Sequence, residues 1–454
     1  MDVIITIISF IALISLIVGI HELGHFSVAR YFDIHVLKFK IGFGKELYSF
    51  QDKNECKYSV GILPLGGYVQ MLGENVITEE QGGSKLINKK SYLDATLNER
   101  AAVTAAGPVA NFLLAIVIYF IISLIGTTHL GSYVGGVQQG SLAEQAELGF
   151  KDKIISIDEI KLDTFNEINI ILSKRIGDTG SIDIGFIEEG SNFISYSTVG
   201  VTKWLSASDQ SNPAKSFGID PLVPPVIGGL LEDGPASRAG LKVGDVIQSV
   251  KDTPIQSWIE LSEILSNIPN ETVLISVLRG NNTFSYSLKT DSFDQNGIKK
   301  GRIGIFASND LDQWPQEIVI KKQENLVNAF LSGFTETYKF TNLIIVSIGK
   351  MITGSVSAEN IGGPIQISVL AGSAAKAGLL SFLSMIAILS INLGLINLFP
   401  IPVLDGGQLL MIAIEKVKGS PISDNFLEHS LRIGVLLVAS LMIFAFVNDI
   451  VRLI

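Results

Sequence analysis

The chain has 454 residues, of which 47% are hydrophobic and 17% charged, and its mean hydropathy is +0.41. This balance is unusual for a fully soluble protein and indicates a chain that is partly dissolved in lipid. The net charge of −10 and the lack of a long basic run argue against a nucleic-acid partner. The single cysteine, Cys56, excludes a disulfide framework and a cysteine-based zinc site.

Four apolar stretches are long enough to cross a bilayer, which takes about 20 residues. They lie at 3–25, 101–126, 376–400 and 431–450. A fifth stretch, 326–352, is interrupted by Glu336, Lys339 and Lys350. We interpret it as an amphipathic helix that lies at the membrane surface.

The distribution of Lys and Arg predicts how these spans are oriented. Neither residue type occurs before position 30, whereas the loop 26–97 carries nine. They are Arg30, Lys38, Lys40, Lys45, Lys53, Lys57, Lys85, Lys89 and Lys90. We therefore expect this loop to be cytoplasmic, and both termini and residues 127–325 to lie on the outer side.

The outer region contains an internal repeat. Residues 135–171 can be laid on residues 228–264 at a constant offset of 93 residues, which matches Asp152 with Asp245. A constant offset indicates a duplication. Each copy predicts a strand, a Gly-rich turn, a short helix, a strand, a helix and further strands.

The second copy resembles a PDZ domain of the bacterial protease type through its segment GPASRAGLKVGDVIQSV, and the first copy follows by register. PDZ domains accept a peptide as an added strand at a sheet edge. The pair is therefore expected either to bind a peptide ligand or to act as a folded spacer that excludes bulky substrates by size. The sequence leaves both alternatives open.

The segment HELGH places His21, Glu22 and His25 at the end of the first apolar stretch. On a helix, positions i and i+4 share one face, so both imidazoles can reach one Zn²⁺ while Glu22 serves as a general base. The alternative is a chance pair of helical histidines. Ionisable groups inside a membrane segment are costly, which favours the zinc interpretation.

Catalytic zinc usually has three protein ligands and an open fourth position. Asp405 is a candidate third ligand, because Pro400 and Pro402 break the preceding helix and Gly406 and Gly407 permit an unusual turn. With four spans, Asp405 and the histidines lie near the same cytoplasmic side. A fifth span over 326–352 would place Asp405 at the wrong leaflet.

Three other histidines are less suitable ligands, because they stand in a basic loop, on the outer side and in a polar loop. They are His35, His129 and His429.

The loop 36–73 predicts antiparallel strands with Gly-rich breaks. A transmembrane helix must unwind before its peptide bonds can be attacked, because its carbonyls are engaged in helical hydrogen bonds. An unpaired strand edge beside the site can hold such an unwound segment. Ordinary cytoplasmic structure is the alternative.

Four features together resemble the site-2 protease family of intramembrane zinc metalloproteases. They are HELGH, GPVAN at 107–111, the paired PDZ-like copies and NLFPIPVLDGG at 397–407. The resemblance covers essentially the whole chain, and it is nearest to the branch that regulates the sigma-E envelope stress response in Gram-negative bacteria.

The resemblance implies roles for individual residues. His21, His25 and Asp405 would hold one zinc ion, with Glu22 as the catalytic base. Substrate backbone would be held by Asn397, Gly66, Gly67 and Tyr68. Gly107 and Asn111 match the family's GPxxN motif, and for them a site role and a purely structural role (close helix packing and a buried amide hydrogen bond) both stay open.

The expected fold is therefore a multi-span α-helical membrane protein with four transmembrane helices, a membrane-associated β-hairpin loop and two tandem α+β PDZ domains. Its expected segments are 1–126 (two membrane helices and the β-loop 36–73), 127–221 and 222–310 (PDZ domains), 311–375 (connecting amphipathic helix region) and 376–454 (two membrane helices).

The expected function is intramembrane zinc-dependent cleavage of a single-span protein in the bacterial inner membrane, after its outer domain has been trimmed. The resemblance suggests an anti-sigma factor and remnant signal peptides as substrates. A metal or proton transporter is a rival, but the chain has no duplicated membrane halves. A membrane-anchored PDZ adaptor is another, but HELGH retains the glutamate that binding alone would not need.

Overall fold

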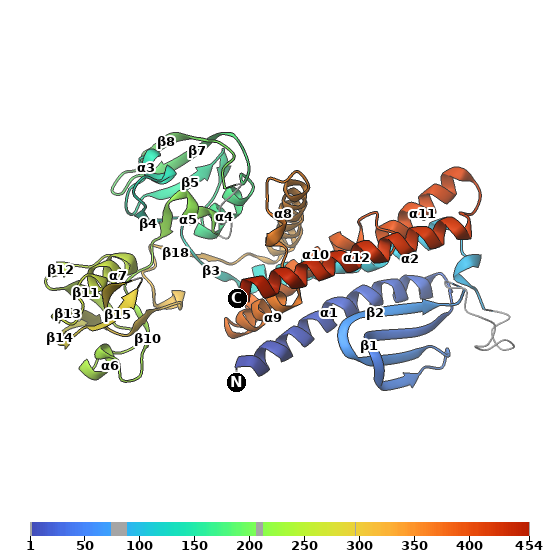
Figure 1. The fold of residues 1–454 in the computed structure, drawn as a ribbon, viewed down its shortest axis with the longest axis horizontal. Coiled ribbons are helices and arrows are strands. Elements are labelled where there is room, and N and C mark those ends of the chain that lie inside the picture. Colours follow the sequence, from blue (N-terminus) through green and yellow to red (C-terminus); the bar gives the residue numbers. More distant parts are fainter. Residues whose placement is uncertain (1, 74–88, 206–211, 296, 454) are drawn as a thin grey trace. The chain divides into compact units, whose positions relative to one another are not determined.

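The computed structural model describes residues 2–73, 89–205, 212–295 and 297–453 (Figure 1). Lys85, one of the cations used to predict orientation, lies outside these residues. The chain forms two compact units. The first comprises Met1–Ile125, Gln323–Ile348 and Ala358–Ile454, and the second comprises Gly126–Lys322 and Gly349–Ser357. The predicted connecting region 311–375 is not a unit of its own, because its residues are divided between the two.

Within the described residues, four helices of the first unit are long and apolar enough to cross a membrane, as predicted. They are α1 (Asp2–Tyr31), α2 (Leu97–Ile125), α10 (Leu379–Asn397) and α12 (Asp424–Leu453) (Figure 1). The shorter α9 (Pro364–Lys376) precedes α10 and packs against α1, where a Cβ at Gly372 would lie 2.3 Å from Thr6 Oγ1.

The first helix is longer than predicted. The sequence predicts a span that ends near residue 25, but α1 continues to Tyr31, so HELGH lies inside the helix and not at its end. The extension is stabilised because Phe26 and Ala29 pack into a core shared with the following sheet. At 1.5 Å per residue, the 30 residues of α1 span about 45 Å, more than the roughly 30 Å of a bilayer core.

The ambiguous fifth stretch forms α8 (Leu326–Ile352). Its Phe340 ring stacks on Tyr119 of α2, with centroids 5.6 Å apart and planes 3° apart. A Cβ at Gly333 would lie 2.6 Å from the carbonyl oxygen of Ile116, so the two backbones approach closely there. The position of α8 at a membrane surface stays a prediction.

The loop predicted over 36–73 forms the antiparallel pair β1 (Val36–Gln51) and β2 (Lys57–Met71) beside α1 (Figure 1). Both strands bend, so that residues 38–41 of β1 pair with residues 67–70 at the end of β2 and with residues 57–60 at its start. Among the described residues, no further strand pairs with the other side of Gly67–Gln70. This segment is therefore an edge of the sheet.

The predicted break after the third apolar stretch is present. α10 ends at Asn397, and α11 (Asp405–Lys418) begins at Asp405 itself. The expectation that Gly406 and Gly407 form an unusual turn is wrong, because both lie in the first helical turn and neither has a positive φ. Both must lack a side chain for another reason: a Cβ on either would lie 2.1 Å from a carbonyl oxygen of the loop that precedes α11.

The second unit contains two modules whose elements recur at the 93-residue offset. β5 (Lys153–Ile157) and α4 (Phe165–Ser173) recur as β11 (Val246–Val250) and α7 (Trp258–Ser266). The four-stranded sheets have the orders β6-β5-β7-β8 and β12-β11-β13-β14, and the two-stranded sheet β4-β9 of the first module corresponds to β10-β17 of the second. The second module also contains the two-stranded sheet β15-β16.

The remaining elements of the first module are β4 (Val134–Val137), α3 (Leu142–Gln145), β6 (Ile160–Lys161), β7 (Gly180–Ile187), β8 (Ile194–Val201), α5 (Pro213–Phe217) and β9 (Ile219–Pro221). Those of the second are β10 (Ile227–Leu230), α6 (Pro235–Ala239), β12 (Thr253–Pro254), β13 (Thr272–Arg279), β14 (Asn282–Lys289), β15 (Asp291–Gln295), β16 (Ile298–Arg302) and β17 (Ile305–Ala307). β3 (Thr127–Leu130) and β18 (Val319–Lys322) pair with each other at the two ends of Gly126–Lys322.

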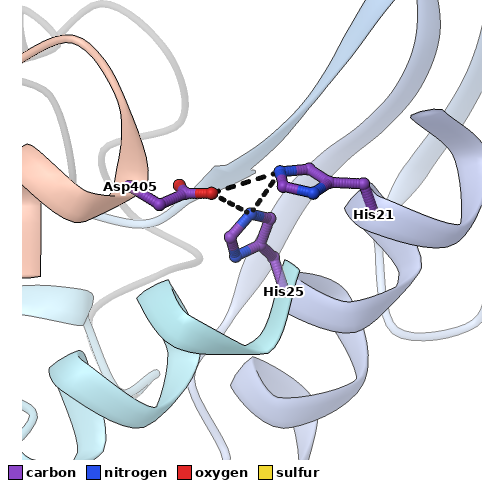
Figure 2. A group of neighbouring side chains, drawn as sticks. All are labelled: His21, His25 and Asp405. Carbon is purple, nitrogen blue, oxygen red and sulfur yellow. Dashed lines mark hydrogen bonds and ion pairs between the residues drawn. The ribbon is translucent and has the colours of Figure 1, made fainter. Parts of the chain in front are cut away.

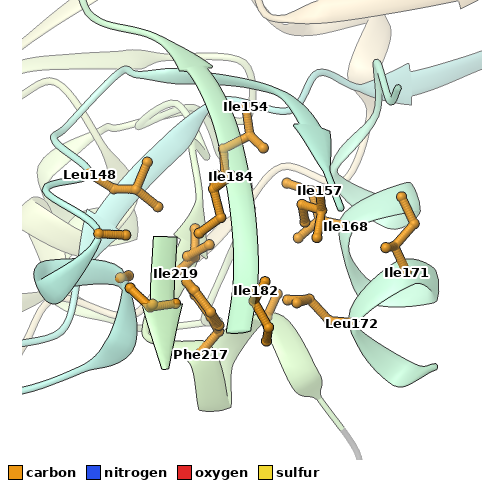
Figure 3. Close-up of a cluster of buried hydrophobic side chains, with 14 of the residues drawn as sticks. Leu148, Ile154, Ile157, Ile168, Ile171, Leu172, Ile182, Ile184, Phe217 and Ile219 are labelled. Atoms are coloured by element: carbon orange, nitrogen blue, oxygen red, sulfur yellow. The ribbon is translucent and has the colours of Figure 1, made fainter. Parts of the chain in front are cut away.

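Each module has its own core of hydrophobic side chains, part of which is shown for the first in Figure 3. The matched aspartates hold equivalent loops. Asp152 accepts the backbone N–H groups of Gly149 at 2.6 Å and Glu189 at 3.0 Å. Asp245 accepts that of Lys242 at 2.9 Å and also pairs with Arg279 at 2.6 Å. Both carboxylates are buried and hydrogen-bonded, as burial of a charge requires.

A capping box begins α4. Glu167 accepts the backbone N–H groups of Asp163 and Thr164, each at 2.9 Å, and lies 3.3 Å from Lys322 Nζ. Burial opposes the ionisation of Glu167, but these donors and the ammonium outweigh it and lower the pKa of the carboxyl from 4.5 to about 2. The carboxylate therefore stabilises the fold above its unfolded-state pKa, and this contribution is lost as the pH falls through about 2.

We expect Glu167→Gln to reduce the protection of α4 amides against hydrogen exchange at pH 7. The deficit relative to wild type should shrink as the pH falls from about 4.5 to about 2, because the wild-type carboxylate is then protonated. Exchange measured by mass spectrometry at several pH values tests this, with Glu263→Gln on the exposed face of α7 as the control. A deficit of equal size at pH 7 and pH 2 contradicts it.

Candidate metal centre and active site

Three side chains that are far apart in the sequence point toward one another (Figure 2). His21 and His25 come from α1, and Asp405 is the first residue of α11. The two Nε2 atoms lie 3.2 Å apart, and Asp405 Oδ2 lies 3.2 Å from that of His21 and 3.5 Å from that of His25. The structure thus brings together the three predicted ligands, while His35, His129 and His429 are not part of this group among the described residues.

The spacing of these atoms fits a zinc ion. Zn–N and Zn–O bonds of roughly 2.0–2.2 Å at tetrahedral angles place two ligand atoms about 3.3 Å apart. Apart from the two histidines, no hydrogen-bond donor among the described residues faces the buried Oδ2 of Asp405. Two imidazole lone pairs and a carboxylate oxygen at this distance repel one another unless a cation lies between them. With these three residues as ligands, a bound zinc ion would keep a fourth position open.

The second nitrogen of each histidine has a partner on α2. His25 Nδ1 donates to the carbonyl oxygen of Val103 at 2.8 Å. His21 Nδ1 lies 3.2 Å from Nδ2 of Asn111, a fully buried side chain whose Oδ1 has no partner among the described residues. When the Asn111 amide is turned so that Oδ1 faces His21 Nδ1, Oδ1 accepts the ring proton of His21. Both Nε2 atoms then keep their lone pairs for a metal.

Gly107 lies directly against the ligands. A Cβ at this position would be 2.2 Å from His25 Nε2 and 2.8 Å from His21 Cε1. The GPVAN segment therefore contacts the centre through both of its motif residues, by close packing at Gly107 and by the amide at Asn111. Sequence reasoning missed Val103, because its contribution is a backbone carbonyl that any residue supplies.

Glu22 is 8% exposed and lies beside the edge of the sheet. A Cβ at Gly67 would lie 2.9 Å from Glu22 Cγ and 3.1 Å from Val18 Cγ1. On the other side, Asn397 Nδ2 lies 3.3 Å from His21 Nε2. The last residue of α10 and the edge of β2 thus both reach the centre.

The residues on either side of Gly67 lie on the sheet. A Cβ at Gly66 would meet the Phe43 ring at 2.2 Å, and the Tyr68 ring lies 5.7 Å from Lys38 Nζ. These two predicted substrate contacts therefore flank the segment beside Glu22.

Comparison with known proteins shows the family of this chain. The model of peptidase family M50 matches residues 9–441. The chain belongs to peptidase family M50. The predicted membership of the site-2 protease family is thereby confirmed, and this M50 peptidase is a zinc metalloendopeptidase.

Individual M50 relatives match along their whole length. The chain is 34% identical over 448 residues to the regulator of sigma-E protease RseP of Salmonella typhimurium, covering 98% of each chain. It is also 34% identical over 449 residues to a putative zinc metalloprotease of Pasteurella multocida, again covering 98% of each chain. Among solved structures, the PDZ domain of an SdrC-like protein from Listeria monocytogenes is 24% identical and covers 19% of this chain and 88% of its own, with a TM-score of 0.17.

We expect Gly107→Ala to weaken zinc binding by at least about tenfold, because the added methyl group must displace the His25 ring. Zinc affinity is measured on the purified full chain by competition with a chromophoric chelator. Gly349→Ala is the matched control, since a Cβ at this helical glycine meets no atom within 4 Å. Wild-type affinity in Gly107→Ala contradicts the described packing.

Proposed function

We propose that this M50 peptidase cleaves a single-span membrane protein within the bilayer, with His21, His25 and Asp405 as zinc ligands and Glu22 as the general base. The observation that carries the proposal is the triangle of ligand atoms with sides of 3.2–3.5 Å, formed beside a buried glutamate among apolar helices. The residue types, their spacing and the family all support the same chemistry.

When bound, zinc supplies a Lewis acid that polarises the peptide carbonyl and increases the acidity of water. Glu22 takes a proton from the attacking water and delivers it to the leaving amine. Val103 and Asn111 hold the two imidazoles in the tautomer that faces the centre. We propose that Asn397, whose Nδ2 lies 3.3 Å from His21 Nε2, donates its amide N–H to the backbone of the substrate next to the scissile bond.

The substrate segment is held as an added strand on Gly67–Gln70. This edge lies beside Glu22, and its glycine lets a second backbone approach closely. Unwinding the substrate helix breaks its i to i+4 hydrogen bonds, and pairing with the edge restores part of them. Gly66 and Tyr68 place the edge by packing against Phe43 and Lys38.

The wider assignments rest on the relatives and the sequence. We propose that the protein lies in the inner membrane, with the centre near the cytoplasmic side, the termini and both modules in the periplasm, and the β1–β2 sheet associated with the membrane. The modules are PDZ domains that bind peptide or exclude bulky substrates. The name of the Salmonella relative supports a role in envelope stress signalling, with an anti-sigma factor trimmed on its outer side as substrate. Remnant signal peptides are also single apolar spans, and we propose them as further substrates.

We expect Glu22→Gln to reduce cleavage at least about a hundredfold, because glutamine cannot accept the proton of the attacking water. Its zinc content should match that of wild type, since the three ligands are untouched. The assay follows a tagged transmembrane substrate without its outer domain on a gel, in detergent, with and without a zinc chelator. Glu336→Gln on α8 is the control. Residual cleavage above a few per cent removes Glu22 from the role of base.

We expect Gly67→Pro to reduce cleavage more than tenfold without changing zinc content, because proline removes a backbone donor from the edge strand. Gly67→Ala keeps the N–H group while adding a Cβ next to Glu22, so it separates the loss of the donor from crowding. Unchanged cleavage by the proline variant rules out the edge-strand mode of substrate binding.

A further inference from the structure

We propose that Arg100 and Glu415 are positioning residues for the metal centre, and that their ion pair fixes Asp405 in place from the far end of α11. The proposal rests on the role of Asp405 as a zinc ligand. It assigns a function to two charged residues that are not among the proposed ligands.

The pair joins the start of α2 to the later part of α11. Arg100 Nη1 lies 3.3 Å and 3.5 Å from the two carboxylate oxygens of Glu415, and both side chains are about four-fifths buried. The guanidinium also stacks over the ring of Tyr92, 5.3 Å from its centroid. A second contact lies next to it, because Lys416 Nζ donates to Asn98 Oδ1 at 3.1 Å.

Asp405 depends on this attachment because of its place in the chain. It is the first residue of α11 and follows a loop that contains Pro400 and Pro402. Glu415 stands ten residues later on the same helix, about 15 Å along the axis. A helix of this length moves as a rod, so a tilt or a slide at Glu415 is transmitted to Asp405.

α2 contacts both helices that carry the proposed ligands. It holds His25 through Val103 and His21 through Asn111, and it holds α11 through Arg100. A ligand triangle with sides of 3.2–3.5 Å tolerates only a few tenths of an ångström of error. Fixing α11 to the helix that orients the histidines keeps Asp405 in register with them.

Because the pair is largely buried, we expect substitution of one partner to weaken zinc binding. Exposed ion pairs contribute little, because water solvates either partner alone. Here, removal of one partner leaves the other charge largely shielded from water, so the helix end moves to find solvent or another partner. Exchanging the two residue types, so that position 100 carries Glu and position 415 carries Arg, restores the attraction between opposite charges at the same place.

The test uses the full chain in detergent and measures zinc affinity by chelator competition, together with thermal unfolding in excess chelator. We expect Arg100→Gln and Glu415→Gln each to weaken zinc binding about tenfold, as loss of outer-shell partners does. Arg100→Glu combined with Glu415→Arg should return the affinity to within about threefold of wild type. Glu428→Gln, which breaks the exposed Arg432–Glu428 pair of α12, should leave it unchanged.

Two results overturn the proposal. The first is wild-type zinc affinity in the single variants, even if their unfolding temperature without zinc falls. The second is a reversed pair that binds zinc no more tightly than the single variants do. Asp405→Ala separates this outcome from failure of the ligand assignment. Wild-type zinc affinity in Asp405→Ala would overturn the proposed ligand set itself. Loss of affinity in Asp405→Ala, with none in the single variants, overturns only the positioning role.

Discussion

The placement of three electron-pair donors inside an apolar helix bundle is the constraint on which this structure depends. Two imidazole nitrogens and a carboxylate oxygen within 3.5 Å of one another are unfavourable without a shared cation, because little water reaches them. A zinc ion at this position would convert this repulsion into binding, and the other polar atoms of the three side chains also need partners. Val103 and Asn111 meet this need for the histidines.

The second helix is the element against which the first unit is assembled. Three helices approach its backbone through a glycine: α1 at Gly24, α8 at Gly333 and α10 at Gly394. A Cβ at these positions would lie 2.3, 2.6 and 3.1 Å, respectively, from a carbonyl oxygen of α2. Small residues let helices pack closely in a membrane, where apolar side chains gain little by leaving lipid. The same close approach brings Val103, Gly107 and Asn111 into contact with His21 and His25. The geometry of the site therefore depends on how closely the helices pack.

The β1–β2 sheet is anchored to the helix that carries His21 and His25. Phe39 of the sheet packs edge-on against Phe26, one residue after His25, with ring centroids 5.5 Å apart. The sheet is thus held by the helix that carries HELGH, and its edge at Gly67 meets Glu22 on that helix. Because the edge and Glu22 share one support, the proposed added strand would have a fixed position relative to Glu22.

The sequence by itself determined the four apolar spans, the helical break before Asp405, the 93-residue repeat and the choice of His21, His25 and Asp405 as candidate ligands, because each rests on apolar composition, a proline, a repeated pattern or a residue type. It placed the end of α1 too early and misassigned Gly406 and Gly407, since packing against distant backbone decides both. Only the tertiary structure decided that Val103 supports His25, that Gly107 makes room for both imidazoles and that Arg100 meets Glu415. These contacts join residues 78 to 315 positions apart, and no local pattern records which distant partner a side chain will find.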